Sequence, residues 1–365
     1  MMQRRDFLKA GAAASASALL PGASFATPFS PLPGTWRHFE IVTRIALKDG
    51  GGARRAWVPL PSIAEADWIK PLGDTWKIEG GTAAAHRVSP YGAKILVAEW
   101  KAGTVTPAIE VTSHVATRDR VVDLARPGTP VPLSSEQRAL NLAATRLIPT
   151  DGIVKATADK ITAGATRDID KARRIYAWII ANTFRDPKVP GCGLGNIEFM
   201  LRTGNLGGKC ADLNALFVGL ARASGVPARD LYGIRVAPSR FGYKSLGANA
   251  EPITKAQHCR AEIWLDEYGW VPADPADVRK VVLEEPPGHL PMNDAKVAAA
   301  RQTLFGAWEG NWVAYNDAHD VALPGSTGLT IGFLMYPQAE SAAGRADCLD
   351  AANFSYTIES REIAI

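Results

Sequence analysis

The stretch that most constrains the fold is residues 207–214, Gly-Gly-Lys-Cys-Ala-Asp-Leu-Asn, where two glycines lead into a cysteine and a helical pattern. Apolar residues recur after Cys210 at helical spacing, at Leu213, Leu216, Phe217 and Leu220. Gly225 and Pro227 then supply a stop signal. Cys210 is therefore expected at a helix N-terminus, where free N–H groups and the helix dipole favour a thiolate. Taken alone, a buried structural cysteine is the commoner interpretation.

A predicted β-hairpin downstream carries a histidine and an aspartate. Residues 258–265 alternate along one strand, residues 266–269 form a turn, and residues 270–274 form the partner strand. His258 and Asp274 flank this hairpin, so they are expected near each other, although Pro272 leaves the register open. Alone, each would more often be a surface or turn residue. Together with Cys210 they predict a thiolate nucleophile, an imidazole base and a carboxylate that fixes the imidazole tautomer.

The first 26 residues are interpreted as an export signal. Residues 4–9, Arg-Arg-Asp-Phe-Leu-Lys, resemble the bacterial twin-arginine signal, and a small-residue apolar stretch follows. Ser24-Phe25-Ala26 offers a cleavage site near Ala26. The apolar stretch is too short for a good transmembrane helix, and no other run of about 20 apolar residues occurs. The mature protein is expected in the periplasm, without stable membrane insertion.

Charge and cysteine usage exclude several classes of partner and cofactor. The 365-residue chain has a formal net charge of +4 and no basic run, so nucleic acid is not an expected partner. The six histidines are scattered and no Cys-x-x-Cys occurs, so neither a metal site nor a cofactor is expected. An oxidising compartment permits disulfides. With Cys210 kept as a free thiol, the pairing among Cys192, Cys259 and Cys348 stays open.

The N-terminal part reads as β structure. Residues 27–35 are a Pro- and Gly-rich linker, and residues 36–126 are predicted to form a small β-sandwich, by strand spacing and turn chemistry. The strand-like runs are residues 39–47, 55–60, 76–78, 94–100 and 108–117, with residues 50–52 as the first turn. The tryptophans of this predicted sandwich are expected in its core: Trp57, Trp68, Trp76 and Trp100.

From residue 127 onward the composition shifts to helical patterns. Helices are predicted at residues 135–147, at 151–163 and from Asp168. Residues 191–195, Gly-Cys-Gly-Leu-Gly, lack nucleotide-loop spacing and are expected to form a loop bordering a cleft. A strand over 231–236 precedes a long loop, residues 237–255, that is a candidate wall of a substrate groove.

The blocks around Cys210, His258 and Asp274 resemble the transglutaminase-like superfamily. The similarity rests on three segments in the family's order: residues 208–217, Gly-Lys-Cys-Ala-Asp-Leu-Asn-Ala-Leu-Phe; residues 258–265, His-Cys-Arg-Ala-Glu-Ile-Trp-Leu; and residues 269–275, Gly-Trp-Val-Pro-Ala-Asp-Pro. By these motifs Cys210 corresponds to the nucleophile, His258 to the base and Asp274 to the third member of a triad.

This resemblance implies an α+β fold. A papain-like transglutaminase core, with helices packed on an antiparallel sheet, would follow the small β-sandwich. The expected organisation is a signal peptide at 1–26, a linker at 27–35, the sandwich at 36–126, the catalytic core at 134–285, and a β-rich extension of the core at 286–365.

The family also implies acyl transfer through a thioester on Cys210. Its members differ in whether an amine or water accepts the acyl group, and periplasmic placement favours water. An amide or isopeptide hydrolase acting on a peptide, a protein or a cell-wall fragment is therefore expected. The alternative is a catalytically silent binding or assembly protein that keeps the fold. The Cys210 backbone N–H is the expected oxyanion donor, with Asn205 as a weaker second candidate.

Two interpretations stay open for several residues near Cys210, His258 and Asp274. Asp212 and Asn214, in the first helical turn, either cap the helix or shape the cleft. Arg260 and Glu262 share a strand face with His258 and either pair with each other or reach the substrate. Trp270 is expected to pack, or to cover the triad.

Overall fold

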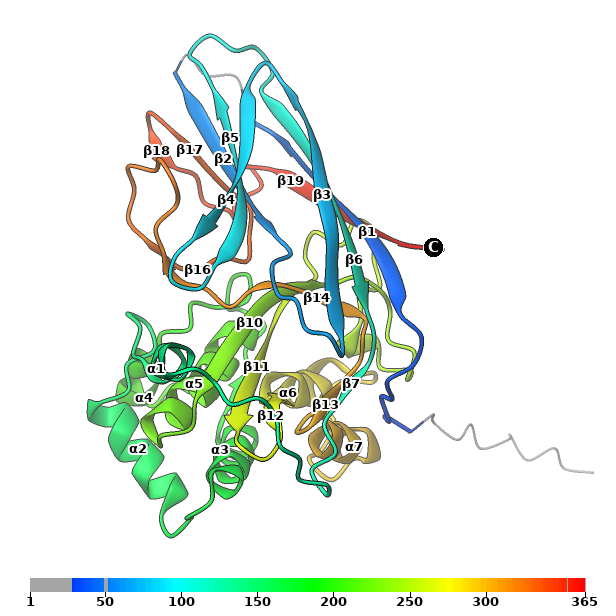
Figure 1. Ribbon diagram of the computed structural model, residues 1–365, viewed down its shortest axis with the longest axis vertical. Helices are drawn as coiled ribbons and strands as arrows, with labels where there is room; N and C mark the ends of the chain where they lie inside the picture. Colours follow the sequence, from blue (N-terminus) through cyan, green and yellow to red (C-terminus); the bar gives the residue numbers. More distant parts are fainter. Residues whose placement is uncertain (1–27, 49–51, 353, 365) are drawn as a thin grey trace, which may run out of the picture.

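The computed structural model describes residues 28–48, 52–352 and 354–364. Figure 1 shows layered strands at one end of the molecule and a helical part at the other. The predicted signal peptide, residues 1–26, lies outside the described residues, as do residues 50 and 51 of the predicted first turn. Within the described residues, no helix has the length and apolar character needed to cross a membrane.

The predicted N-terminal strands form two antiparallel layers. One sheet has the order β19-β1-β6-β3, and its strands are Tyr356–Ile363, Arg37–Ala46, Ala108–Thr117 and Ile69–Glu79. The other has the order β18-β17-β2-β5-β4, with strands Gly344–Arg345, Gln338–Ser341, Arg54–Leu60, Ala93–Trp100 and Thr82–Val88. Between them, alternate residues such as Ile45, Val58 and Leu96 form a buried cluster, as expected for a sandwich.

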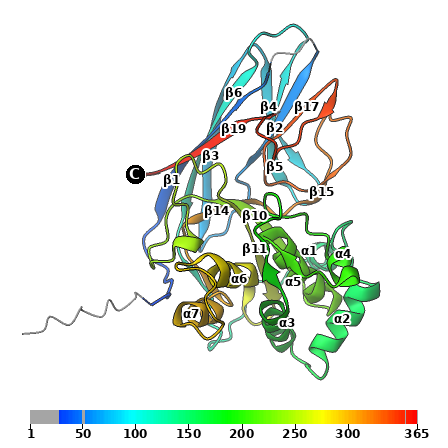
Figure 2. The ribbon, with the colours of Figure 1, turned by 180° about the vertical axis from the view of Figure 1, so that it is seen from behind.

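Strand pairing places the end of the chain differently from our expectation. Residues 286–365 were expected to extend the core, but β19 pairs with β1 over His38–Ile45, and β17 pairs with β2. Figures 1 and 2 both show β19 crossing beside β1, so the first and the last strand of the described residues pair in the sandwich. The reason is that Ile358 and Phe354 are buried, which supplies apolar surface that the N-terminal strands leave open. The domain boundaries themselves stay predictions.

The second half is an antiparallel sheet covered by helices, which confirms the expected α+β class. The sheet has the order β12-β11-β10-β14, and its strands are Gly269–Ala273, Gln257–Leu265, Ala228–Arg235 and Trp312–Asn316. Helix α5, Cys210–Ala223, packs on β10 and β11, and its residues are buried along the whole length. Because α5 is covered by other helices as well as by the sheet, it is apolar on nearly every side.

Further helices and several short strands surround this unit. The helices are α1 Ser135–Leu142, α2 Gly152–Thr162, α3 Asp168–Asn182, α4 Ile197–Thr203, α6 Pro275–Glu284 and α7 Ala295–Thr303, with a 3-10 turn at Lys244–Leu246. The short strands are β7 Arg120–Val121, β8 Phe184–Arg185, β9 Gly207–Gly208, β13 Ala307–Trp308, β15 His319–Val321 and β16 Ile331–Phe333. In Figure 2, α2, α3 and α5 lie on one side of the core, and α6 and α7 lie on the other.

Local signals explain these helices, including those that the sequence analysis missed. Ser134 caps α1 in a capping box with Gln137, so the helix starts at residue 135 as predicted, but it ends at Leu142 because Ala143 is already extended. The unpredicted helices α4, α6 and α7 each start behind a side-chain cap, from Asn196, Asp274 and Asp294. Their short, mixed sequences carry little periodicity, so the caps were the available signal.

A buried ion-pair group joins the sandwich to the core. Arg120, directly after the sandwich strands, pairs with Glu262 on β11, and its Nη2 donates to the backbone oxygen of Trp270 at 2.7 Å. Glu262 also accepts from Arg229 at 2.7 Å. The side chain of Glu262 is fully buried, so removing either partner would leave an uncompensated charge. Glu262 therefore serves this junction and does not pair with Arg260.

Three of the four predicted core tryptophans are buried, and Trp76 is the exception at 36% exposure. Trp68 lies where the sandwich meets the core, with its ring 5.3 Å from Trp308 and 6.1 Å from Trp312. Trp76 lies on β3, at the edge of its sheet, where one face meets solvent.

This difference yields a stability prediction. Trp68→Ala should lower the free energy of unfolding by about 3–5 kcal/mol, because it removes a fully buried ring and leaves a cavity. Trp76→Ala, the matched control, should cost less than about 1 kcal/mol. Equilibrium unfolding in urea, followed by circular dichroism, measures both, and similar losses in the two variants would contradict the packing assigned to Trp68.

Candidate active site

Cys210 is the first residue of α5, as the sequence analysis predicted. Its side chain is buried, at 3% exposure, and its backbone N–H has no acceptor among the described residues. The next amide, that of Ala211, donates to the backbone oxygen of Cys192 at 2.9 Å. The Cys210 N–H is thus one of the unpaired donors of a helix N-terminus, beside its own sulfur.

Asp212 fixes the glycine-rich loop onto the start of α5. One carboxylate oxygen accepts from the amides of Leu194 and Gly195, at 3.0 and 2.9 Å, and the other accepts from Lys209 at 3.0 Å. A Cβ atom at Gly193 would lie 1.8 Å from this carboxylate, and the φ of Gly193 is +94°. Only glycine fits there. Asp212 therefore both caps the helix and shapes the loop, so its two predicted roles coincide.

His258 and Asp274 meet at the end of the sheet. Ala261 pairs with Ala273, so Asp274 follows β12 on the strand next to His258. The His258 Nε2 lies 2.8 Å from Asp274 Oδ2, and both side chains are buried. A carboxylate at Nε2 assigns the proton to that nitrogen and leaves Nδ1 for Cys210. Cys210 and His258 line the same cavity, so the structure brings together the three residues that the sequence singled out.

Asn214 links the helix to this pair. Its Nδ2 donates to Asp274 Oδ1 at 3.1 Å and to the backbone oxygen of Cys259 at 2.8 Å. The amide of Asp277 also donates to Asp274 Oδ1, at 3.0 Å. Because Asn214 is fully buried, these bonds have no competition from water. Asn214 therefore positions the carboxylate that faces His258.

The sequence analysis missed Asp277 and Arg235. Asp277 Oδ1 lies 3.4 Å from His258 Nε2, and both oxygens of Asp277 accept from Arg235 Nη2, at 2.6 and 2.8 Å. The available signal was Asp274-Pro275, an N-cap followed by proline at the first helical position. Recognition of that helix start would have placed Asp277 one turn inside α6, beside Asp274.

These contacts set the charge states of the base and the thiol. Burial and Arg235 lower the pKa of His258, but Asp277 and Asp274 outweigh them and raise it to about 9. Interactions with the neighbouring Cys192 and Cys259 thiols, together with His258, hold the pKa of Cys210 well below its ordinary value of 9, although burial opposes this. The arrangement favours a thiolate beside an imidazolium near neutral pH.

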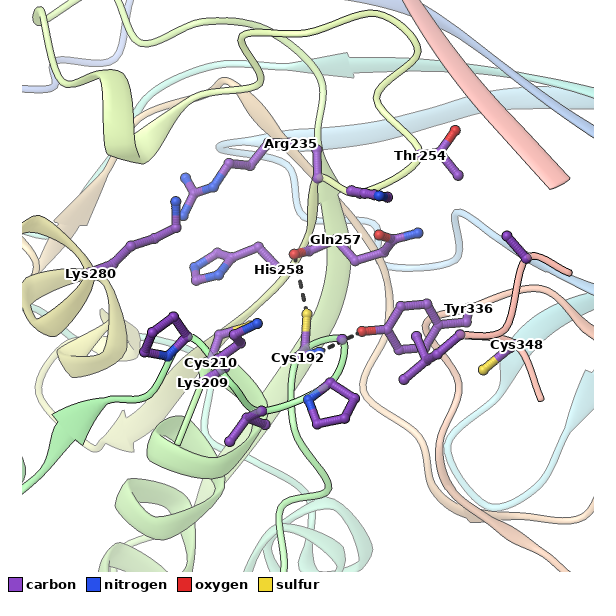
Figure 3. A pocket seen from close by; sticks show the side chains of 18 of the residues that line it. Cys192, Lys209, Cys210, Arg235, Thr254, Gln257, His258, Lys280, Tyr336 and Cys348 are labelled. Carbon is purple, nitrogen blue, oxygen red and sulfur yellow. Dashed lines mark hydrogen bonds between the residues drawn. The ribbon is translucent and has the colours of Figure 1, made fainter. Parts of the chain in front are cut away.

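A cavity of about 620 Å³ opens at Cys210 and His258. The predicted loop at residues 191–195 contributes Gly191 and Cys192 to its lining, and the end of the 237–255 loop contributes Thr254 and Lys255. Figure 3 shows Lys280 and Arg235 on one side of His258, with Gln257 and Tyr336 on the other. The C-terminal segment closes this second side with Cys348, Leu349, Ala351, Phe354 and Tyr356.

All four cysteines are free thiols in the structure. The Cys192 thiol donates to the backbone oxygen of Gln257 at 3.3 Å, and its amide donates to the Tyr336 hydroxyl at 2.8 Å, as Figure 3 shows. Cys259 is fully buried on β11. Hydrogen bonding to Cys210 and burial raise the pKa of both neighbouring thiols, Cys192 and Cys259, well above 9. These two thiols therefore stay protonated beside Cys210 and are themselves poor nucleophiles.

Other predicted residues lie away from the cavity. Asn205 is exposed, its side-chain oxygen accepts from the Gly207 amide at 3.1 Å, and it does not line the cavity. Arg260 lies 3.7 Å from Asp274 and packs between the rings of Trp308 and Trp312. Trp270 packs edge-on against Trp264, with ring centroids 5.6 Å apart, and is not among the residues that line the cavity at His258.

One set of side chains within the described residues has the spacing of a metal site. Ligand atoms of His258, Asp274 and Asp277 lie within 4.8 Å of one another. However, Asp277 is occupied on both oxygens by Arg235, and Asp274 by His258 and Asn214. A guanidinium already supplies the positive charge that a metal ion would bring, so this donor set fits an internal ion-pair network better than a metal.

Comparisons with known proteins agree with this geometry. A sequence model of the transglutaminase-like superfamily matches residues 155–275, a range that contains Cys210, His258 and Asp274. A model of the twin-arginine translocation signal matches residues 1–21 and confirms the predicted export to the periplasm.

Two relatives extend over most of the chain. A protein of uncharacterised function from Haemophilus influenzae is 37% identical over 333 residues, which is 87% of this chain and 88% of the relative. The crystal structure of a proposed cysteine protease from Cytophaga hutchinsonii superposes with a TM-score of 0.54 at 15% identity, covering 91% of this chain and 92% of that one. At this identity the superposition shows a shared fold.

The pKa shifts predict the reactivity of Cys210. Its alkylation by iodoacetamide should stay near its maximal rate at about pH 7, because a lowered pKa keeps the thiolate until the pH falls through that value. His258→Ala should move the midpoint of the rate–pH profile to higher pH, since the imidazolium is lost. Mass spectrometry of tryptic peptides after timed labelling measures the rate at each cysteine. Cys348→Ala is the control and should leave the fast phase intact; equal, slow labelling of all four thiols would refute the low pKa.

Asn214 should influence the pH dependence of Cys210 labelling through Asp274, without contacting the sulfur itself. Asn214→Ala removes a donor from Asp274, so this carboxylate protonates more readily and stabilises the imidazolium less. The midpoint of Cys210 labelling should therefore rise, alongside a stability loss of about 1–3 kcal/mol for the unpaired Cys259 carbonyl. Asn182→Ala, an exposed asparagine on α3, should change neither quantity. A stability loss with an unchanged midpoint would show that Asn214 is only structural.

Proposed function

Because the chain belongs to the transglutaminase-like superfamily, we propose that it is an exported cysteine-dependent acyl-transfer enzyme that hydrolyses an amide or isopeptide bond. The observation that carries the proposal is that the hydrogen-bonded His258–Asp274 pair and Cys210, at a helix N-terminus, meet at one cavity, which Cys210 and His258 line. A peptide, a protein or a cell-wall fragment is the substrate class that fits a periplasmic location.

In the proposed reaction, the Cys210 thiolate attacks the carbonyl carbon of the scissile amide. The carbonyl oxygen takes up the electron pair, and the free Cys210 N–H donates to the oxyanion. His258 gives its Nδ1 proton to the leaving nitrogen as the C–N bond breaks, which releases an amine and leaves a thioester. Throughout, Asp274 keeps the Nε2 proton in place and so holds the ring in the productive orientation.

Hydrolysis then completes the cycle. The neutral His258 takes a proton from water at Nδ1, and the hydroxide adds to the thioester carbonyl. The C–S bond breaks, a carboxylic acid is released, and the thiolate–imidazolium pair is restored. An amine in place of water would give transamidation by the same steps. Water is in excess in the periplasm, which is why we favour hydrolysis.

One observation favours the alternative of a catalytically silent binding protein. Cys210 and His258 are 3% and 2% exposed, so a large substrate has little direct access to the sulfur. In that alternative the cavity would bind a ligand without covalent chemistry. The two functions differ in whether a covalent acyl-enzyme forms.

Turnover assays should separate these functions. A panel of peptides, peptidoglycan fragments and amine donors is incubated with the mature protein, and products are identified by mass spectrometry in ¹⁸O-labelled water and with hydroxylamine. We expect one ¹⁸O in the released acid, a hydroxamate when hydroxylamine competes, and an acyl adduct on Cys210 after acid quenching.

Variants then assign the chemistry. Cys210→Ala and His258→Ala should each lower kcat/KM at least about a thousandfold. Lys101→Ala, an exposed residue on the sandwich, should leave it unchanged. Turnover that persists in both variants would contradict the proposed cysteine mechanism. Binding of a fragment without any acyl adduct would favour the catalytically silent alternative.

A further inference from the structure

We propose that the cavity at Cys210 selects an acyl donor that carries carboxylates close to the scissile carbonyl, that is, an acidic peptide. The inference rests on the proposed function, because it concerns the same site, and it adds the chemical class of the substrate. Two sources share this chemistry: a linear acidic protein segment and a cell-wall stem peptide with free carboxylates.

The charged residues that line the cavity are mostly cations. Leaving out His258 and the internally paired Arg235, they are Arg185, Lys188, Lys209, Lys255 and Lys280, with Glu284 as the lining carboxylate. Five positive groups against one negative group leave a surplus of four. The whole chain also has a formal net charge of +4. The cavity alone therefore carries a surplus equal to that of the entire sequence, so its charge does not reflect a generally basic surface.

Most of this positive charge has no partner within the protein. Glu284 is shared by Arg185 and by Lys280, whose Nζ lies 2.9 Å from it. Among the described residues, no ion pair involves Lys188, Lys209 or Lys255. A surface that gathers cations in a partly enclosed space attracts anions more strongly than isolated surface lysines do, because the cavity walls exclude part of the screening water.

Gln257 supplies an independent indication of an accepting ligand. It is 9% exposed, it lines the cavity, and its Nε2 has no hydrogen-bond partner. A buried amide donor without an acceptor costs free energy that a bound acceptor would recover. Figure 3 shows the Gln257 side chain directed away from His258, on the Tyr336 side of the cavity. It is thus placed to meet the substrate chain beyond the reacting carbonyl.

The positions of the cations indicate where the carboxylates would lie. Lys209 directly precedes Cys210 and lines the same cavity, so its ammonium can bind a group near the acyl carbon. Lys280 is on α6, on the His258 side of the cavity in Figure 3. Lys255 lies just before β11, at the mouth, and is exposed. Carboxylates on both flanks of the scissile bond would therefore find cationic partners, whereas a lysine-rich peptide would be repelled.

Binding to the mature Cys210→Ala protein tests the selectivity without any turnover. Three fluorescent peptides of equal length carry glutamate, glutamine or lysine at the same positions, and a stem peptide with free carboxylates forms a fourth arm. Fluorescence anisotropy should show the glutamate peptide or the stem peptide binding at least about tenfold more tightly than the glutamine peptide. The tighter of the two identifies the source, and its affinity should fall as salt rises from about 50 to about 500 mM.

Single substitutions assign this preference to the cavity. Lys255→Gln should weaken binding of the glutamate peptide several-fold and leave the glutamine peptide unchanged, since one charge is removed at an exposed position. Lys101→Gln, equally exposed but on the sandwich, should have no effect on either peptide. Gln257→Leu, which removes the unpaired donor and keeps the volume, should weaken binding of both.

The outcomes separate this inference from the proposed function. Equal affinity for the glutamate and glutamine peptides, no binding of any peptide, or equal effects of Lys255→Gln and Lys101→Gln would overturn the acidic selectivity. A clear preference of Cys210→Ala for the acidic peptide, with no turnover of the same peptide by the unmodified protein, would support the selectivity and contradict the proposed hydrolase function.

Discussion

The contact on which the site depends is the buried bond between Asn214 and Asp274. Asn214 stands four residues after Cys210, so the two side chains lie on the same face of α5, about one turn apart. By holding Asp274, Asn214 sets the helix at a defined height against the end of the sheet, and the N-terminus of α5 is thereby placed opposite His258. Asp212 completes the arrangement, because it ties the loop that carries Cys192 to the same helix end.

The charges behind His258 are arranged so that proton transfer costs little. Arg235 and Arg260 face Asp274 and Asp277, which balances two positive and two negative groups in a buried space. These four groups, taken together with Cys210 and His258, have no net charge whether the shared proton lies on Cys210 or on His258. Loss of that proton to solvent would leave a net charge away from water, which is expensive. The network therefore favours exchange within the pair, the condition that a cysteine nucleophile and its acid–base partner need.

The parts of the site that the sequence could predict are those with a local signal. Cys210 begins a strongly periodic helix, which predicts its place at a helix N-terminus. His258 and Asp274 flank a recognisable hairpin, so their proximity to each other followed from short-range rules. Asp277 and Arg235 lacked such a signal, because their partnership spans 42 residues and joins a missed helix to a strand. Trp76 shows a further limit: strand propensity predicted its burial, but only the sheet order reveals that β3 is an edge.

The path of the chain's end explains why the cavity has its shape. Strands β17 and β19 join the sandwich, so the segment between them must pass the mouth of the site, where Cys348, Phe354 and Tyr356 line the cavity. Just before β17, the Tyr336 hydroxyl accepts from the amide of Cys192 and so holds the loop that carries this cysteine next to Cys210. The sandwich is therefore more than a preceding domain, because its closure by the last strands builds the cavity wall opposite His258. An edge that would otherwise stay open to pairing is covered by the same strand that completes the site.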